Sequence, residues 1–205
     1  EPLGIIAEDN HTLVVMQRPE LTRLRDTDGD GEADHYQTIS DDFGMSGNYH
    51  EFAFGPARDK DGNYYVGLNL ASSGASIRPE IRGEFRHYGI SREQFYKNHR
   101  AGSGRMYSAT PYRGWIMKIA PDGKTTPFAS GFRSPNGVNF DAQGRLWATD
   151  NQGDWLGTSK LFHVKENNFH GHPASLVWTD SWQKGRNPLK VLDRKSTRLN
   201  SSHVK

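Results

Sequence analysis

The 205-residue sequence contains no cysteine. Disulfides and thiolate metal sites are therefore excluded within this chain. It also lacks any apolar run that approaches the roughly 20 residues of a membrane-spanning helix, so we expect no membrane span in it. A large excess of charge of one sign is missing too, because 26 lysines and arginines stand against 24 aspartates and glutamates.

The small positive charge that remains comes from the end of the chain. Residues 193–205 contribute four basic side chains and one aspartate, so without them the formal net charge changes from +2 to −1. The basic balance therefore gives no support for a nucleic-acid or membrane role. This stretch has no period-2 pattern and resembles translated adaptor read-through. We expect a domain at residues 1–192 followed by a non-native or disordered tail at 193–205.

What the sequence does have is a unit of two short strands joined by a tight turn, which occurs three times. The turns lie at Asn10, Gly62 and Gly144, with spacings of 52 and 82 residues. The first spacing is close to the roughly 40–50 residues of familiar propeller blades. The second is longer because residues 71–113 are inserted. The period therefore indicates a propeller.

An outer pair of strands is expected after the inner pair of the first two units. These expected strands are runs of β-branched and aromatic residues bounded by turn residues. They are residues 21–25, 35–39, 114–120 and 125–129, and the third unit continues with residues 160–164. We therefore predict an all-β fold, a β-propeller fragment of about three blades with four antiparallel strands each. Propellers close with roughly 4–8 blades, and the chain begins at Glu1 rather than methionine, so we expect a piece of a longer protein.

The insertion at residues 71–113 is rich in glycine, serine and arginine. Ser91 and Gln94 have capping-box spacing, which predicts one short helix around residues 91–100. A long loop at this point would lie over one face of a propeller, where lids and substrate-selecting loops lie. The alternative is a surface loop that contacts no ligand.

An acidic, glycine-containing loop follows the third expected strand. Its carboxylates stand at loop positions 1, 3, 5 and 9, with glycine at position 6, and this alternation turns successive oxygens toward one Ca²⁺. The predicted ligands are the carboxylates of Asp26, Asp28, Asp30 and Asp34 and the backbone carbonyl of Glu32. Position 12 is Gln37 instead of the bidentate glutamate of an EF-hand. We predict a structural calcium ion at the rim; the alternative is a solvated turn.

Propeller ligands lie at the central channel. The residues just before the innermost strand of each blade reach this channel. The repeat places His50 there in the second unit, and Arg133 with Ser134 in the third. A histidine titrates in the range that suits a general base, and a planar guanidinium suits a carboxylate-bearing ligand. A structural role for His50 is the alternative.

Two stretches carry a family resemblance: residues 50–69, with His50 ahead of Phe54-Gly55-Pro56, and residues 131–178. They resemble the glucose/sorbosone dehydrogenase-like propellers, whose soluble members use pyrroloquinoline quinone (PQQ). In that family a histidine at this place takes the proton from the substrate hydroxyl. The resemblance therefore implies that His50 is the catalytic base.

The resemblance also implies a set of cofactor-binding residues. An Arg-Asn pair binds the quinone in the family; Arg133 matches the arginine, whereas Ser134 stands where asparagine is expected. The backbone carbonyls that hold the cofactor calcium map to about Gln152 and Gly153.

Three shorter motifs, at residues 46–51, 149–155 and 169–173, are closer still to large exported bacterial propeller proteins often labelled membrane-bound dehydrogenases. This resemblance implies a periplasmic or secreted location. It also implies a cytochrome c-type module in the full-length protein and a sugar-like substrate or glycan as ligand.

Three functions remain open from the sequence. The first is a quinoprotein-type sugar or alcohol dehydrogenase, and the second is a non-catalytic propeller that binds glycan or protein. The third is a metal-dependent, gluconolactonase-like hydrolase, with Asn136 and Asp150 as oxygen donors and Glu8 or Glu51 as the further carboxylate. The alternating histidines of residues 170–172 are interpreted as a packing turn rather than a metal site.

Overall fold

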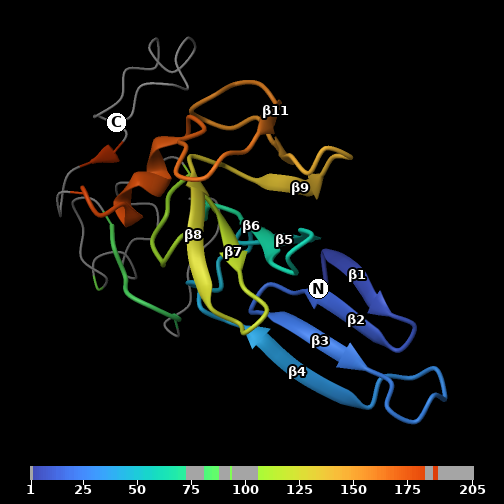
Figure 1. The fold of residues 1–205 in the computed structure, drawn as a ribbon. Helices are drawn as coiled ribbons and strands as arrows, with labels where there is room; N and C mark the ends of the chain where they lie inside the picture. The colour runs from blue at the N-terminus through green and yellow to red at the C-terminus, as the bar shows by residue number, and fades with distance from the viewer. Residues whose placement is uncertain (1, 73–80, 88–92, 94–105, 183–186, 189–205) are drawn as a thin grey trace.

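The computed structural model describes residues 2–72, 81–87, 93, 106–182 and 187–188. They form three antiparallel sheets with the strand orders β1-β2-β3-β4, β5-β6-β7-β8 and β9-β10-β11. Within each sheet, every strand pairs with its neighbours in sequence, so each sheet is a meander. Figure 1 shows the β5–β8 sheet between the other two. This arrangement is the partial β-propeller that the sequence predicts.

The strand bounds follow the predicted runs closely. The first sheet contains β1 (Gly4–Asp9), β2 (Thr12–Met16), β3 (Leu21–Arg25) and β4 (His35–Ser40). The second contains β5 (Ala53–Arg58), β6 (Tyr64–Leu68), β7 (Trp115–Ile119) and β8 (Thr125–Ser130). The third contains β9 (Pro135–Phe140), β10 (Leu146–Asp150) and β11 (Lys160–His163).

The third sheet has three strands in the described part of the chain instead of four, because the chain after β11 returns to the second sheet. There the amide of Asn167 donates to Phe128 O at 2.7 Å, and that of His170 donates to Ser130 O at 2.8 Å. These bonds satisfy part of the edge of β8 that would otherwise be open to pairing.

A 3-10 helix at Pro173–Trp178 follows, which the sequence did not predict. Its N-cap is His172, whose Nδ1 accepts from the amide of Ala174 at 3.3 Å. The helix expected around residues 91–100 lies outside the described residues apart from Glu93, and so does the tail at 193–205. No helix in the described ranges is long and apolar enough to cross a membrane.

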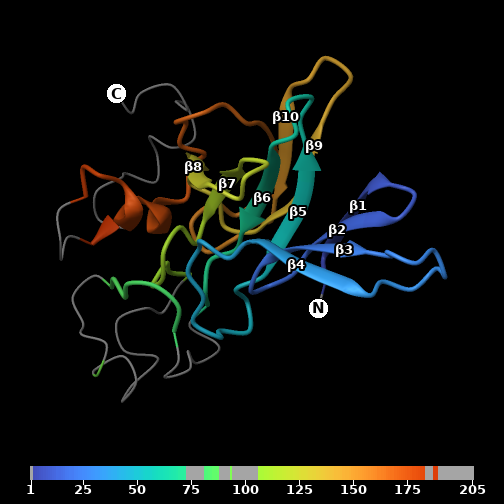
Figure 2. The same cartoon turned by 60° about the horizontal axis from the view of Figure 1, so that its bottom comes forward.

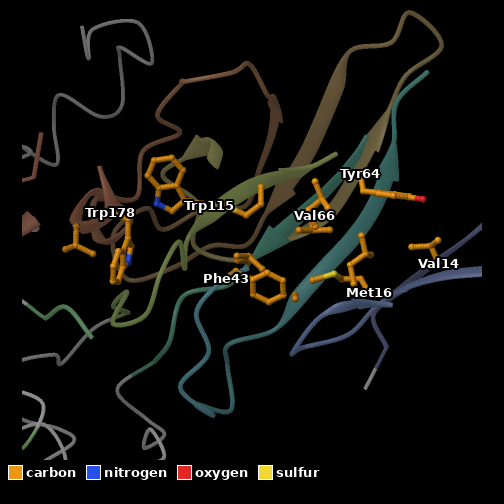
Figure 3. Close-up of a cluster of buried hydrophobic side chains, with 13 residues drawn as sticks. Val14, Met16, Phe43, Tyr64, Val66, Trp115 and Trp178 are labelled. Atoms are coloured by element: carbon orange, nitrogen blue, oxygen red, sulfur yellow. The ribbon is translucent and has the colours of Figure 1, made fainter. Parts of the chain in front are cut away.

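Two buried apolar clusters join the sheets. Side chains alternate across a strand, so β6 directs Tyr64, Val66 and Leu68 into the cluster shared with the first sheet and Tyr65 into the cluster shared with the third. Figure 3 shows the first of these clusters, in which Val14 and Met16 of β2 lie near Tyr64 and Val66. The second sheet is therefore buried on both faces. Its innermost strand β5 lies beside β9, the innermost strand of the third sheet (Figure 2).

Equivalent aspartates close the inner hairpin turns of the second and third sheets. Asp59 accepts from the amides two and four residues on and from the Tyr65 hydroxyl at 3.2 Å. Asp141 accepts from the amides at the same offsets and from the Trp147 indole N–H at 2.8 Å. Tyr65 and Trp147 are each the second residue of their strand, so the repeat in sequence is a repeat in hydrogen bonding.

We expect Asp59→Ala to lower the free energy of unfolding by about 1–3 kcal/mol, because the buried Tyr65 hydroxyl and two turn amides lose their acceptor. Urea unfolding measures the change. The matched control is Asp122→Ala, in the β7–β8 turn, where the carboxylate accepts from one exposed amide, that of Lys124. Its expected effect is within about 0.5 kcal/mol. Equal losses in the two variants would contradict a special role for the repeated aspartate.

Candidate functional site

The candidate site lies where the chain enters the innermost strands β5 and β9. These two strands contact each other, and the residues that follow β6 bridge their entry loops. The amide of Asn69 donates to Phe52 O at 2.9 Å, and the amide of Leu70 donates to Arg133 O at 3.0 Å. The loops that carry His50 and Arg133 are therefore joined through the backbone.

His50 is half-buried, and both its backbone and its ring are held. Its amide donates to Asn48 Oδ1 at 3.0 Å, and its Nδ1 lies 2.6 Å from Ser72 Oγ. Burial lowers the pKa of His50, and the positive charges of Arg133 and Arg18 lower it further. The imidazole is therefore mainly neutral at pH 7, and two guanidinium groups lie within electrostatic reach of it.

Arg18 is a member of this site that the sequence reading missed. It follows β2, its Nη2 donates to Asn48 O, and its guanidinium carbon lies 5.4 Å from the centre of the Phe52 ring. Its Nε is buried and has no hydrogen-bond partner among the described residues. Arg18 does not precede an innermost strand, so the repeat carries no signal for it.

Arg133 is fixed by its backbone, and its side chain keeps a free donor. Its amide and that of Ser134 donate to the buried Asp150 carboxylate at 3.1 and 2.6 Å, and Lys160 Nζ lies 3.7 Å from the same group. A Cβ added at Gly153 would lie 3.0 Å from Arg133 Cγ, so this backbone packs on the arginine stem. Within the described chain, Arg133 Nε is buried without a partner.

The other residues assigned by resemblance lie beside Arg133 but differ in what they offer. The Ser134 hydroxyl donates to Asn136 Oδ1 at 2.7 Å, so it is already engaged. Gln152 is exposed and Gly153 partly so. The carbonyl oxygens of Gln152 and Gly153 accept no backbone hydrogen bond from any described residue.

The end of the insertion fixes the loop that carries His50. Arg113 has no exposed surface and donates to the carbonyls of Gly44, Glu51 and Phe52 at 2.8, 3.3 and 3.0 Å. The buried Glu51 carboxylate accepts from the Ser46 amide at 2.7 Å. Burial lowers the pKa of Arg113 to about 10 against the opposing effect of Glu51, so the guanidinium stays charged at neutral pH.

Comparison with known proteins agrees with this architecture. No family model and no curated protein matches the sequence. A crystal structure of a glucose dehydrogenase matches with a TM-score of 0.50 and 13% identity over 84% of this chain. The chain has a glucose dehydrogenase-like β-propeller fold. It spans 49% of the length of that glucose dehydrogenase.

Two other solved structures are similar at lower TM-scores. One is a candidate gluconolactonase, with a TM-score of 0.38 and 18% identity over 75% of this chain and 45% of that one. The other is the PQQ-bound aldose sugar dehydrogenase of Streptomyces coelicolor, with a TM-score of 0.37 and 18% identity over 84% of this chain and 62% of that one.

The three carboxylates named for a gluconolactonase-like site, Glu8, Glu51 and Asp150, have different hydrogen-bond partners, while Ser134 links Asp150 to Asn136. Glu8 of β1 accepts from Arg23 at 2.6 Å and from the Tyr64 hydroxyl, between the first two sheets. Glu51 and Asp150 accept backbone amides in the two different entry loops.

The alternating histidines are also structural in the described structure. The Nε2 of His172 lies 3.3 Å from Asp154 Oδ1, and the Nδ1 of His170 lies 3.2 Å from Ser130 O. Both imidazoles are buried, and the His170 ring stacks on Phe132 with ring centres 4.6 Å apart. These contacts are those of a packing turn.

In the acidic loop, the structure brings three of the predicted carboxylates together. These are Asp26, Asp28 and Asp30, and one carboxylate oxygen of each lies within 4.8 Å of one oxygen of each of the other two. The Asp34 carboxylate instead accepts from the Thr27 amide and hydroxyl at 3.2 and 2.7 Å. The Asp34 carboxylate is not part of this group, and the predicted Glu32 ligand is its backbone carbonyl rather than its carboxylate.

The pKa of His50 should rise when Arg133 is replaced by glutamine, because removing a nearby positive charge makes the imidazolium less unfavourable. An NMR titration of the histidine ring protons measures it. Arg18→Gln should shift the pKa in the same direction. Arg58→Gln, at the far end of β5, is the control and should leave it unchanged. If neither Arg133→Gln nor Arg18→Gln changes the pKa of His50, the two arginines do not act on this histidine.

Proposed function

We propose that this propeller carries the proton-accepting and ligand-binding groups of a quinoprotein-type dehydrogenase for sugar-like or alcohol hydroxyls. The observation that supports this most is the neutral, half-buried His50 with two cationic side chains, Arg18 and Arg133, close enough to lower its pKa. A neutral imidazole accepts a proton from a hydroxyl. Cationic groups stabilise the negative charge that develops on the substrate oxygen.

The residues present fit an anionic quinone such as PQQ. Arg18 and Arg133 each keep a buried Nε–H that no described residue accepts, and a guanidinium matches a carboxylate with two parallel hydrogen bonds. The backbone carbonyls of Gln152 and Gly153 are oxygen donors of the type that calcium prefers. When bound, the quinone supplies the hydride-accepting chemistry.

The chain's own residues divide the remaining tasks. His50 takes the hydroxyl proton at its open nitrogen, while Arg18 and Arg133 orient the anionic ligand. Asp150 keeps Arg133 in place through two backbone amides. The proposal includes a cytochrome c-type module that accepts electrons, because a reduced quinone must be reoxidised. It also includes an exported location for the protein.

The proposal includes calcium at the rim, held by the acidic loop. Three carboxylates within 4.8 Å of one another repel each other unless a cation lies between them. The loop joins β3 and β4, at the outer edge of the first sheet. An ion there stabilises the fold and takes no part in proton transfer.

Calcium should bind the loop with measurable heat and raise the midpoint of thermal unfolding. At a hundredfold excess over Kd the stabilisation is about 2.7 kcal/mol. Asp28→Asn should abolish both effects, whereas the control Asp122→Asn should keep them. If calorimetry detects neither heat nor stabilisation, the loop is a solvated turn.

The dehydrogenase proposal is tested with the full-length protein, PQQ and calcium, by dye reduction with a panel of sugars. His50→Ala should retain quinone binding and lose at least about a hundredfold in kcat, the usual contribution of a general base. Arg133→Gln should weaken quinone binding. Arg58→Gln, which carries the same change at the opposite end of β5, should leave both unchanged.

The outcomes separate the three functions. Absence of both quinone binding and dye reduction would support a non-catalytic glycan- or protein-binding propeller. Lactone hydrolysis that depends on a divalent metal would support the gluconolactonase-like alternative instead.

A further inference from the structure

The ring of His50 has one hydrogen bond in the described structure, and it leads into the start of the insertion. Nδ1 lies 2.6 Å from the hydroxyl oxygen of Ser72. No described residue hydrogen-bonds Nε2, and this nitrogen is not sealed from solvent. The two ring nitrogens therefore have distinct environments, one tied to the protein and one open.

A buried asparagine fixes the two residues relative to each other. Asn48 has no exposed surface, and its Oδ1 accepts from the amides of His50 and Ser72 at 3.0 and 3.3 Å. Its Nδ2 donates to Ser72 O at 3.0 Å and lies 3.3 Å from the Tyr107 hydroxyl. Because one side chain holds both backbones, the Ser72 hydroxyl is set against Nδ1 before any ligand arrives.

We propose that Ser72 is a positioning residue for His50: its Oγ accepts the hydrogen bond from Nδ1–H, so that the lone pair of the neutral ring stays on Nε2. This inference rests on the proposed function, in which Nε2 receives the substrate proton. A serine hydroxyl can accept one hydrogen bond and still donate its own proton elsewhere, so it is compatible with both the neutral and the protonated ring.

Nearby charges are consistent with this tautomer. Because Ser72 occupies Nδ1, Nε2 is the ring nitrogen without a hydrogen bond among the described residues. Arg18 and Arg133 lie close enough to the ring to lower its pKa, and a positive charge that faces Nε2 favours a lone pair there over an N–H. The hydrogen bond from Nδ1–H to Ser72 thus leaves Nε2 as the nitrogen that accepts a proton. In general, the hydrogen bond made by one imidazole nitrogen determines whether the other is protonated.

The test is the tautomer of His50, read from long-range ¹H–¹⁵N spectra of the full chain with labelled histidine, at a pH above the His50 transition. Its signals are identified by their loss in His50→Gln. We expect protonated Nδ1 and unprotonated Nε2 in the wild type and in Ser72→Thr. Ser72→Ala should shift the population toward the other tautomer. Thr126→Ala, an exposed hydroxyl deletion on β8, is the control and should match the wild type.

Either of two results would overturn the proposal: an unprotonated Nδ1 in the wild type, or a tautomer population that Ser72→Ala leaves unchanged. The wild-type spectrum alone decides the first, even if Ser72→Ala does not fold. In the dye-reduction assay, Ser72→Ala should lower kcat on the order of tenfold with little change in KM. A wild-type protein without activity would contradict the dehydrogenase proposal, while the spectra would still decide the role of Ser72.

Discussion

The buried guanidinium of Arg113 organises the segment that carries His50, the centre of the proposed site. It donates to three carbonyls of the segment from Gly44 to Phe52 and faces the buried Glu51. Burying a charge costs several kcal/mol unless hydrogen bonds and an opposite charge compensate. These hydrogen bonds hold the segment in the arrangement that presents His50 at the entrance to β5. Arg113, at the end of the insertion, is thus part of the framework of the proposed site.

The propeller fold brings residues from three sheets together at the proposed site. The second sheet is buried on both faces, so β5 is held against β1 on one side and β9 on the other. The turn after β2 supplies Arg18, the entry to β5 supplies His50, and the entry to β9 supplies Arg133. Each cationic side chain lowers the pKa of the histidine. The result is a neutral imidazole close to two positive charges.

Sequence and structure agree wherever a local pattern determines the outcome. The predicted strands and turns are confirmed because period-2 alternation and glycine turns act over a few residues, as the Asp59 and Asp141 hairpins show. The convergence of Asp26, Asp28 and Asp30 also follows from their spacing in one short loop. The carboxylate of Asp34, the fourth predicted ligand, accepts from the Thr27 amide and hydroxyl, and its role as a calcium ligand stays a prediction.

The sequence by itself determined the all-β class, the repeat and the positions of His50 and Arg133 ahead of innermost strands. Only the tertiary structure decided what surrounds them. Ser72 is 22 residues from His50, and Arg113 is 69 residues from Gly44, so no periodicity links either pair. The same holds for the return of the chain to β8 after β11, which leaves the third sheet with three strands in the described residues. These contacts depend on how sheets pack, and packing brings together residues whose spacing along the chain carries no pattern.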